Sequence, residues 1–196
     1  MTKEFNKERF EVLIAKCSKW SKDRNIIKGS TAIDQSIMLV EELGELATGI
    51  RKDNKALIID AIGDIVVVLN GMCLQLTKED LQTYSKYIYG TDQTEFCIKQ
   101  DLASLCKSVA VLNTGVSNNP SRVLKDKIHN VLADLNYICI RLNLTLDECL
   151  EESYDQIKDR KGIMFNGSFI KSSDKDYTQI ARLVAGVIAP NGNIIK

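Results

Sequence analysis

The chain has 196 residues, of which 44% are hydrophobic and 27% charged, and its formal net charge is zero. This length fits one domain, or two small halves that share a core, and the composition is that of an ordinary globular protein. A neutral chain has no overall field that favours nucleic acid or an anionic membrane surface, so we expect neither as a partner.

The N-terminal stretch MTKEFNKERFEVLIAK alternates charged and apolar residues, which argues against a secretory signal. We also expect no membrane span, because no apolar run of sufficient length is free of charges. Six cysteines without a CxxC pair are typical of thiols in a reduced protein, and a single histidine, His129, argues against zinc. The expected location is the cytoplasm, which for a viral protein is the host cytoplasm.

Apolar residues at helical spacing predict an all-α fold. A first amphipathic helix within residues 9–26 carries a stripe that includes Phe10 and Trp20. A second, over 34–50, comes after Ser30 and Thr31, either of which could cap it with Asp34 as a capping-box partner. Length and two aspartates four residues apart favour a third helix over a strand, and a fourth, capped by Thr77, is expected next; these two predicted helices span 52–76 and 77–90.

The C-terminal part contains a strong hairpin signal. The sequence GIMFNGSFIK alternates around Asn166-Gly167, a pair typical of two-residue hairpin turns. We therefore predict a small two-stranded ribbon there. The tail after it is expected to hold a short helix and an irregular end.

A shift of 66 residues aligns 39–76 with 105–142 without a gap, and ten of the 38 positions are identical. Chance would give about two or three identities, so we infer an internal duplication. We expect a single domain over 1–171 and a tail over 172–196, the domain comprising an active half, a degenerate repeat and the hairpin at about 1–92, 95–162 and 163–171.

Carboxylates cluster on two of the predicted helices. The sequence VEELGEL places three glutamates within one broad helical face, and fifteen residues later two aspartates share a face of the next helix. If these helices are antiparallel neighbours, the following side chains converge: Glu41, Glu42, Glu45, Asp60 and Asp64.

Like charges at this density repel each other, and burial of Asp64 among apolar residues adds to the cost. Three glutamates on one helix are often only a solvated face, whereas a divalent cation would remove both penalties at once. Oxygen ligands without histidine or cysteine indicate Mg²⁺, or Mn²⁺, rather than zinc. Since Mg²⁺ keeps several waters and is usually completed by phosphates, we expect metal-dependent phosphate chemistry.

The acidic motif resembles that of the MazG-like and dimeric dUTPase superfamily of all-α nucleoside triphosphate pyrophosphohydrolases, whose signature is EExxE followed by ExxD. EELGE at 41–45 matches the first part, and AIGD at 61–64 matches the second except that Ala61 replaces the glutamate. The stretches WSKDRNI and SYDQIKDRKGIMFNGSFIK are similar to viral, phage-type MazG-like proteins, so the resemblance covers most of 10–171.

The resemblance implies a four-helix-bundle core built from two fused halves. It implies a Mg²⁺ site of Glu42, Glu45 and Asp64, with Asp60 as our replacement for the missing fourth ligand. Glu41 or Glu45 would position the attacking water, and a nucleotide would be the substrate. Homodimerisation of the fused bundle is left open, and the substrate-binding candidates are Trp20, Arg24, Gln35, Asn70, Lys158, Arg160 and Lys161.

For several of these candidates a purely structural role is an alternative: Trp20 and Asn70 as core residues, and the basic cluster as the end of a helix. In the second half the shift replaces most acids with neutral or basic residues, including Lys107 and Lys127. We expect one active site per chain, with the second half as structural partner and a candidate phosphate clamp. Two other functions stay open: a nucleotide-binding pseudoenzyme, and a helical module whose acids bind a basic partner.

Overall fold

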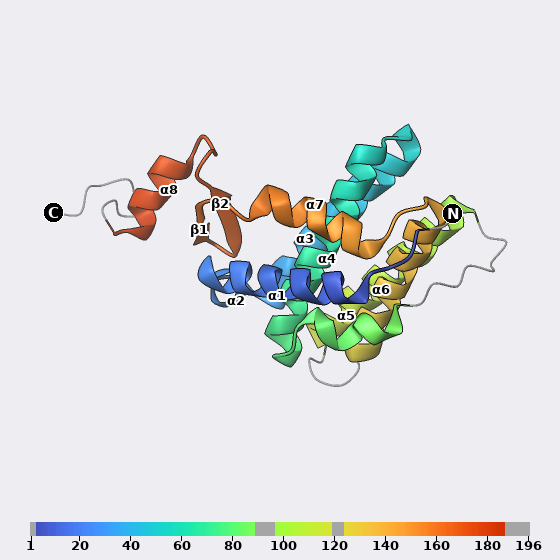
Figure 1. The fold of residues 1–196 in the computed structure, drawn as a ribbon. Helices are drawn as coiled ribbons and strands as arrows, with labels where there is room; N and C mark the ends of the chain where they lie inside the picture. Colours follow the sequence, from blue (N-terminus) through green and yellow to red (C-terminus); the bar gives the residue numbers. More distant parts are fainter. Residues whose placement is uncertain (1–2, 89–96, 119–123, 187–196) are drawn as a thin grey trace.

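The computed structural model describes residues 3–88, 97–118 and 124–186. Over these residues the chain is almost wholly helical with one two-stranded antiparallel sheet, so the predicted all-α fold with a small C-terminal hairpin is confirmed (Figure 1). The elements in chain order are α1 Lys7–Asp23, α2 Ile26–Gly29, α3 Ala32–Lys52, α4 Lys55–Thr77, the 3₁₀ helix η1 Leu81–Tyr87, α5 Ile98–Asn118, α6 Leu124–Arg141, α7 Leu146–Ile157, β1 Gly162–Phe165, β2 Ser168–Lys171 and α8 Tyr177–Val184.

Helices α3 and α4 begin at residues that satisfy their free N–H groups. Thr31 accepts a hydrogen bond from the Asp34 backbone at 3.2 Å, and Asp34 accepts one from the Thr31 backbone at 2.7 Å. This capping box confirms Thr31, of the two candidates, as the cap of α3. Asn54 caps α4 through the Leu57 N–H, and the Asp53 N–H bonds to carbonyl oxygens at the end of α3, so the tight connection between the two helices is fixed at both sides.

Four helices form the bundle: α3 packs on α4, α5 packs on α6, α3 contacts α5 and α4 contacts α6. A shift of 66 residues carries the bounds of α3 onto those of α5. Several positions that are identical under this shift are fully buried in both halves, as the duplication hypothesis requires of a shared core: Leu39 and Leu105, Leu46 and Leu112, Ile62 and Ile128, Leu69 and Leu135, and Cys73 and Cys139.

The central helix of the molecule is α4, whose apolar side chains face several neighbours. By length and composition alone Lys55–Thr77 could cross a membrane, although it is not free of charges, since it carries Asp60 and Asp64. However, 67% of its most apolar window is buried inside the structure. Packing against α3, α6 and α7 accounts for this apolar surface, as in the core helix of a globular protein.

The predicted helix over 77–90 is corrected by the structure. Thr77 is the last residue of α4, where its hydroxyl donates to the Cys73 carbonyl oxygen. Asp80, not Thr77, caps the next helix, and the described part of that helix is 3₁₀ rather than α. The Asn70 side chain inside α4 accepts a hydrogen bond from the Leu81 N–H at 3.1 Å, which ties η1 back onto α4.

The hairpin is confirmed, with Asn166 and Gly167 both at positive φ, 49° and 80°. Positive φ at both central residues is the type I′ geometry that Asn-Gly favours. The turn lies against the start of α3, as a Cβ on Gly167 would be only 2.6 Å from Asp34 Cγ. The hairpin thus covers one end of the α3–α4 pair.

The predicted short helix of the tail is confirmed as α8, which contacts β1 and extends away from the bundle (Figure 1). None of its residues is buried. The irregular end predicted after it falls on 187–196, outside the described residues. The six cysteines are free, with Cys97 and Cys106 exposed and the other four buried.

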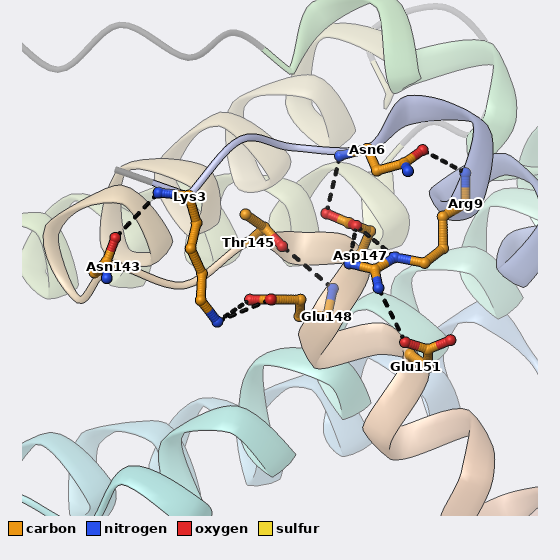
Figure 2. Close-up of polar contacts among 8 residues, drawn as sticks. All are labelled: Lys3, Asn6, Arg9, Asn143, Thr145, Asp147, Glu148 and Glu151. Atoms are coloured by element: carbon orange, nitrogen blue, oxygen red, sulfur yellow. Dashed lines mark hydrogen bonds and ion pairs between the residues drawn. The ribbon is translucent and has the colours of Figure 1, made fainter. Parts of the chain in front are cut away.

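Helix α7 is held to α1 by a cluster of polar contacts shown in Figure 2. Asp147 is fully buried and accepts hydrogen bonds from the Asn6 backbone and from both Nε and Nη2 of Arg9, the Nε bond at 2.7 Å. Arg9 also contacts Glu151, and Lys3 pairs with Glu148. These contacts fix the start of α7, the helix that flanks α4 beside the acidic side chains.

We expect Arg9→Met to lower the free energy of unfolding by about 2–3 kcal/mol, because it leaves the buried carboxylate of Asp147 without its cation. The matched control is Lys19→Met, which breaks the exposed pair with Asp23 on the same helix and should cost less than about 0.5 kcal/mol. Urea denaturation of both variants measures the difference. Equal effects would contradict a structural role for the Arg9–Asp147 pair.

Candidate active site

A cleft of about 390 Å³ lies between α3, α4, the end of α7 and the hairpin. Five carboxylates predicted from the sequence line it together, three from α3 and two from α4: Glu41, Glu42, Glu45, Asp60 and Asp64. The expected convergence of the two acidic clusters therefore occurs. The cleft also has an apolar wall formed by Trp20, Ile26, Met38, Val67, Val68, Ile157, Met164 and Phe169.

The carboxylates destabilise one another in the folded protein. Burial, and then the negative charges of Asp64, Glu45, Glu41 and Asp60, raise the pKa of Glu42 to about 8. Burial and the charge of Asp60 likewise raise the pKa of Asp64 to about 6, although a hydrogen bond with Ser153 and the charge of Arg160 act in the opposite direction. The cleft thus carries more negative charge than its protein surroundings compensate.

Asp60 reaches the cleft, whereas Ala61, which replaces the glutamate of the ExxD motif, does not. Ala61 is fully buried in the core, so a glutamate there would not occupy the same place as the Asp60 carboxylate. Gln156 of α7 donates a hydrogen bond to Asp60 at 2.9 Å. These placements favour Asp60 over position 61 as the acidic group that completes the set.

Helix α7 approaches α4 closely at Gly63. A Cβ on Gly63 would lie 2.0 Å from Ser153 Oγ and 2.3 Å from the Cys149 carbonyl oxygen. This glycine therefore allows the buried Ser153 to lie beside Asp64 and to donate to the Asp60 carbonyl oxygen. Sequence reasoning singled out neither Ser153 nor Gln156; the only signal for them was the resemblance of the stretch that begins at Ser153.

Within the described residues, no group of three or more His, Cys, Asp or Glu side chains is drawn together tightly enough to hold a metal ion. The donor set nevertheless fits Mg²⁺, because it consists of carboxylates only and two of them have raised pKa values. Mg²⁺ is commonly bound by one or two carboxylates, several waters and substrate phosphates. A closed protein cage is therefore not required for such a site.

Three of the predicted substrate-binding residues line the cleft: Trp20, Gln35 and Arg160. Trp20 is also a core residue, 8% exposed, whose indole N–H donates to the Ile157 carbonyl oxygen at 2.7 Å and whose ring packs against Phe169. Arg160 lies after the end of α7 and favours the ionised form of Asp64. Both a structural and a binding role are thus compatible with the position of Trp20.

Four predicted substrate-binding residues are not part of the cleft lining. Arg24 donates to the Lys158 and Arg160 carbonyl oxygens and stacks over Trp20, so it closes the C-terminal end of α7. Asn70 is fully buried and bonded to Ser18 and to η1. The Lys158 ammonium group pairs with Asp155 on the surface, and Lys161 faces a separate, shallower depression.

The second half does not provide the predicted phosphate clamp. All residues that line the cleft belong to 20–71 or 156–171, so Lys107 and Lys127 lie outside it. Instead, the hairpin supplies a cation that sequence reasoning missed, Lys171, together with Phe169. Its only sequence signal was the resemblance of the hairpin segment, since nothing in the spacing placed β2 beside the acidic helices.

Fold and cleft together define an all-α protein with an acidic, partly apolar cleft. Among proteins of known sequence, the chain is similar to the "uncharacterized 18.2 kDa protein in rep-hol intergenic region" of Haemophilus phage HP1, with 44% identity over 57 residues. The match covers 29% of this chain and 35% of the phage protein, so the chain spans about a third of that relative. No protein-family model and no solved structure matches the chain.

Proposed function

We propose that the protein is a Mg²⁺-dependent pyrophosphohydrolase that converts a ribo- or deoxyribonucleoside triphosphate to the monophosphate and pyrophosphate. The observation that carries this proposal is the joint lining of one cleft by five carboxylates and an apolar wall. Mg²⁺ would offset the excess negative charge, substrate phosphates would complete its coordination, and the apolar wall suits a nucleobase. The similarity to a phage protein favours action in the cytoplasm of an infected host.

In this mechanism Glu42, Glu45, Asp60 and Asp64 would hold the cation. When bound, Mg²⁺ neutralises and polarises the phosphoryl oxygens. Glu41, or another carboxylate that the cation leaves free, accepts a proton from the attacking water. The water oxygen bonds to the α-phosphorus, the bond from that phosphorus to the bridging oxygen breaks, and pyrophosphate leaves.

The cations of the cleft are suited to the departing group. Arg160 and Lys171 line the cleft with the acids, and negative charge grows on the bridging oxygen as the bond breaks. Fixed positive charges near that oxygen stabilise the transition state. We assign this role to Arg160 and Lys171 rather than to the outward-facing Lys158 and Lys161.

A nucleotide-binding protein without turnover is the second candidate. It is favoured by the absence, among the described residues, of three carboxylates close enough to hold a metal. Because Ala61 is buried, Ala61→Glu would place a carboxylate in the core, so this variant does not restore a ligand. A helical module that binds a basic partner has no comparable support, since it leaves the apolar wall unexplained.

The deciding experiment measures pyrophosphate release from a panel of nucleoside triphosphates with Mg²⁺ or with EDTA. Release that requires the metal establishes the hydrolase. Thermal stabilisation by Mg²⁺ and a nucleotide without any release favours the second candidate, since a ligand stabilises the folded state by mass action. Neither release nor stabilisation would contradict both.

A further inference from the structure

One buried amide in the cleft is left with an unused acceptor. Gln35 is 8% exposed and lines the cleft. Its Nε2 donates to Ser30 Oγ at 3.1 Å, while its Oε1 accepts no hydrogen bond from the described residues. This oxygen is not among the fully buried acceptors that lack a partner, so it is open to the cleft, where a bound ligand can supply the hydrogen bond.

The orientation of this amide is fixed by a chain of donors. Ser30 Oγ gives its only hydrogen to the Ile26 carbonyl oxygen at 2.7 Å, so it can only accept from its other neighbours. It accepts from Gln35 and also from Gln75 Nε2 at 3.1 Å. The Gln75 amide is itself held, because it donates to the Ser30 carbonyl oxygen at 2.9 Å. Gln35 must therefore turn its NH₂ toward Ser30 and leave its oxygen for the cleft.

The space in front of that oxygen is kept open by a glycine on the facing helix. A Cβ on Gly71 of α4 would lie 3.3 Å from Gln35 Oε1, and Gly71 lines the same cleft. Any larger residue there would crowd the acceptor. Gly71 thus leaves a small opening in the cleft, and Gln35 Oε1 is the hydrogen-bond acceptor at that opening.

Gln35 lies at the opposite end of the cleft from the glutamates of α3. Gln35 and Glu42 are seven residues apart, hence on one face of α3 and separated by about 10 Å along its axis. Since α4 runs back along α3, Gly71 lies beside Gln35 while Asp64 lies nearer the glutamates. A nucleotide bound between Gln35 and the carboxylates would direct its phosphates to the carboxylates and its base to the Gln35 amide.

We propose that Gln35 binds the edge of the base: its Oε1 accepts a hydrogen bond from an N–H on that edge, and Ser30 is the positioning residue that holds it as an acceptor. This inference rests on the proposed function, because it assumes a nucleotide in the cleft. The ligand class is a nucleoside triphosphate with an amino or imino N–H at the edge that faces Gln35. A base with only acceptor atoms at that edge leaves Gln35 unpaired and is rejected.

The test compares each nucleotide that the protein hydrolyses with an analogue that lacks the N–H. The analogue is the deamino nucleotide for adenine and cytosine, the ring-N-methyl nucleotide for uracil and thymine, and for guanine the nucleotide that is both N1-methylated and without its 2-amino group. For the wild-type protein we expect kcat/KM to be roughly tenfold or more lower for the analogue, as for the loss of one buried hydrogen bond. Equal values for both nucleotides would overturn the proposal while leaving the hydrolase intact.

Two variants test the origin of the discrimination. Gln35→Leu removes the acceptor, and Ser30→Ala removes the group that orients it; both should bring the ratio of the two kcat/KM values toward one. Ser30 does not line the cleft, so a purely structural defect there would lower both values and leave the ratio unchanged, which would contradict the positioning role. If no nucleotide is hydrolysed or bound by the wild-type protein, it is the proposed function that fails.

Discussion

Asp64→Asn is expected to reduce metal-dependent pyrophosphate release by on the order of a thousandfold, because it removes the charge of a metal-holding side chain without changing its shape. The same variant should be more stable than the wild-type protein in EDTA at neutral pH and above. Burial and the charge of Asp60 oppose the ionised form of Asp64 in the folded state, and asparagine carries no charge. Loss of activity with a gain in melting temperature separates a functional role from misfolding.

The internal repeat supplies a matched control for this result. Asp60 lines the cleft, and its repeat equivalent Asp126 is exposed and lies outside it. Asp60→Asn should lower pyrophosphate release more than tenfold, whereas Asp126→Asn should leave it unchanged. Steady-state kinetics at saturating Mg²⁺ compares the two. Equal losses in both variants, or full activity in Asp64→Asn, would contradict the assignment of these aspartates.

Much of the fold can be predicted from local signals that tertiary packing does not override. The Asn166-Gly167 turn and the capping box at Thr31 each satisfy a backbone requirement within a few residues. The prediction of a helix capped by Thr77 was wrong because a side chain outside this segment binds its backbone. The Asn70 side chain accepts a hydrogen bond from the Leu81 N–H. The sequence pattern within 77–90 carries no information about this partner.

The acids of the cleft could be predicted because the i, i+3 and i, i+4 spacings place them on one face and the helices are joined by a short connection. Of its cations, Arg160 was predicted only as one of three basic candidates, and Lys171 was not predicted. The exposed Lys158 and Lys161 look the same in sequence as Arg160, and only the course of the chain after α7 decides which of them turns inward. Lys171 reaches the cleft because the hairpin packs against α2 with its turn beside Asp34 of α3, which are long-range contacts.

The charge balance of the cleft makes the stability of the protein depend on pH in a direction opposite to that of most carboxylates. The pKa of Glu42 is raised to about 8 and that of Asp64 to about 6 from usual values of 4.5 and 3.8. As pH rises from about 4.5 to 8, the unfolded chain has already released the Glu42 proton that the folded protein still holds. Unfolding then releases a proton, so the free energy of unfolding falls across this window.

Without metal, the loss from Glu42 is expected to be on the order of 3 kcal/mol by pH 8, with a smaller loss from Asp64 that is complete above about pH 6. Mg²⁺ competes with protons for the same carboxylates, so its binding is weak where they are protonated and strong where they are ionised. We therefore expect Mg²⁺ to raise the melting temperature by several degrees at pH 8 and by little at pH 5. Thermal unfolding at matched ionic strength, with Mg²⁺ or EDTA, measures both effects.

Glu42→Gln is the variant that tests the cause. It has nearly the same volume and cannot ionise, so it should flatten the decline of stability between about pH 6 and 8, above the range in which Asp64 contributes, and also reduce the Mg²⁺-induced shift at pH 8. Glu79→Gln provides a control, since Glu79 pairs with Lys125 on the surface and does not line the cleft. A Mg²⁺ shift that is equal at pH 5 and pH 8 would show that the cation acts elsewhere than on these carboxylates. A decline that persists in Glu42→Gln would mean that another group titrates in this window.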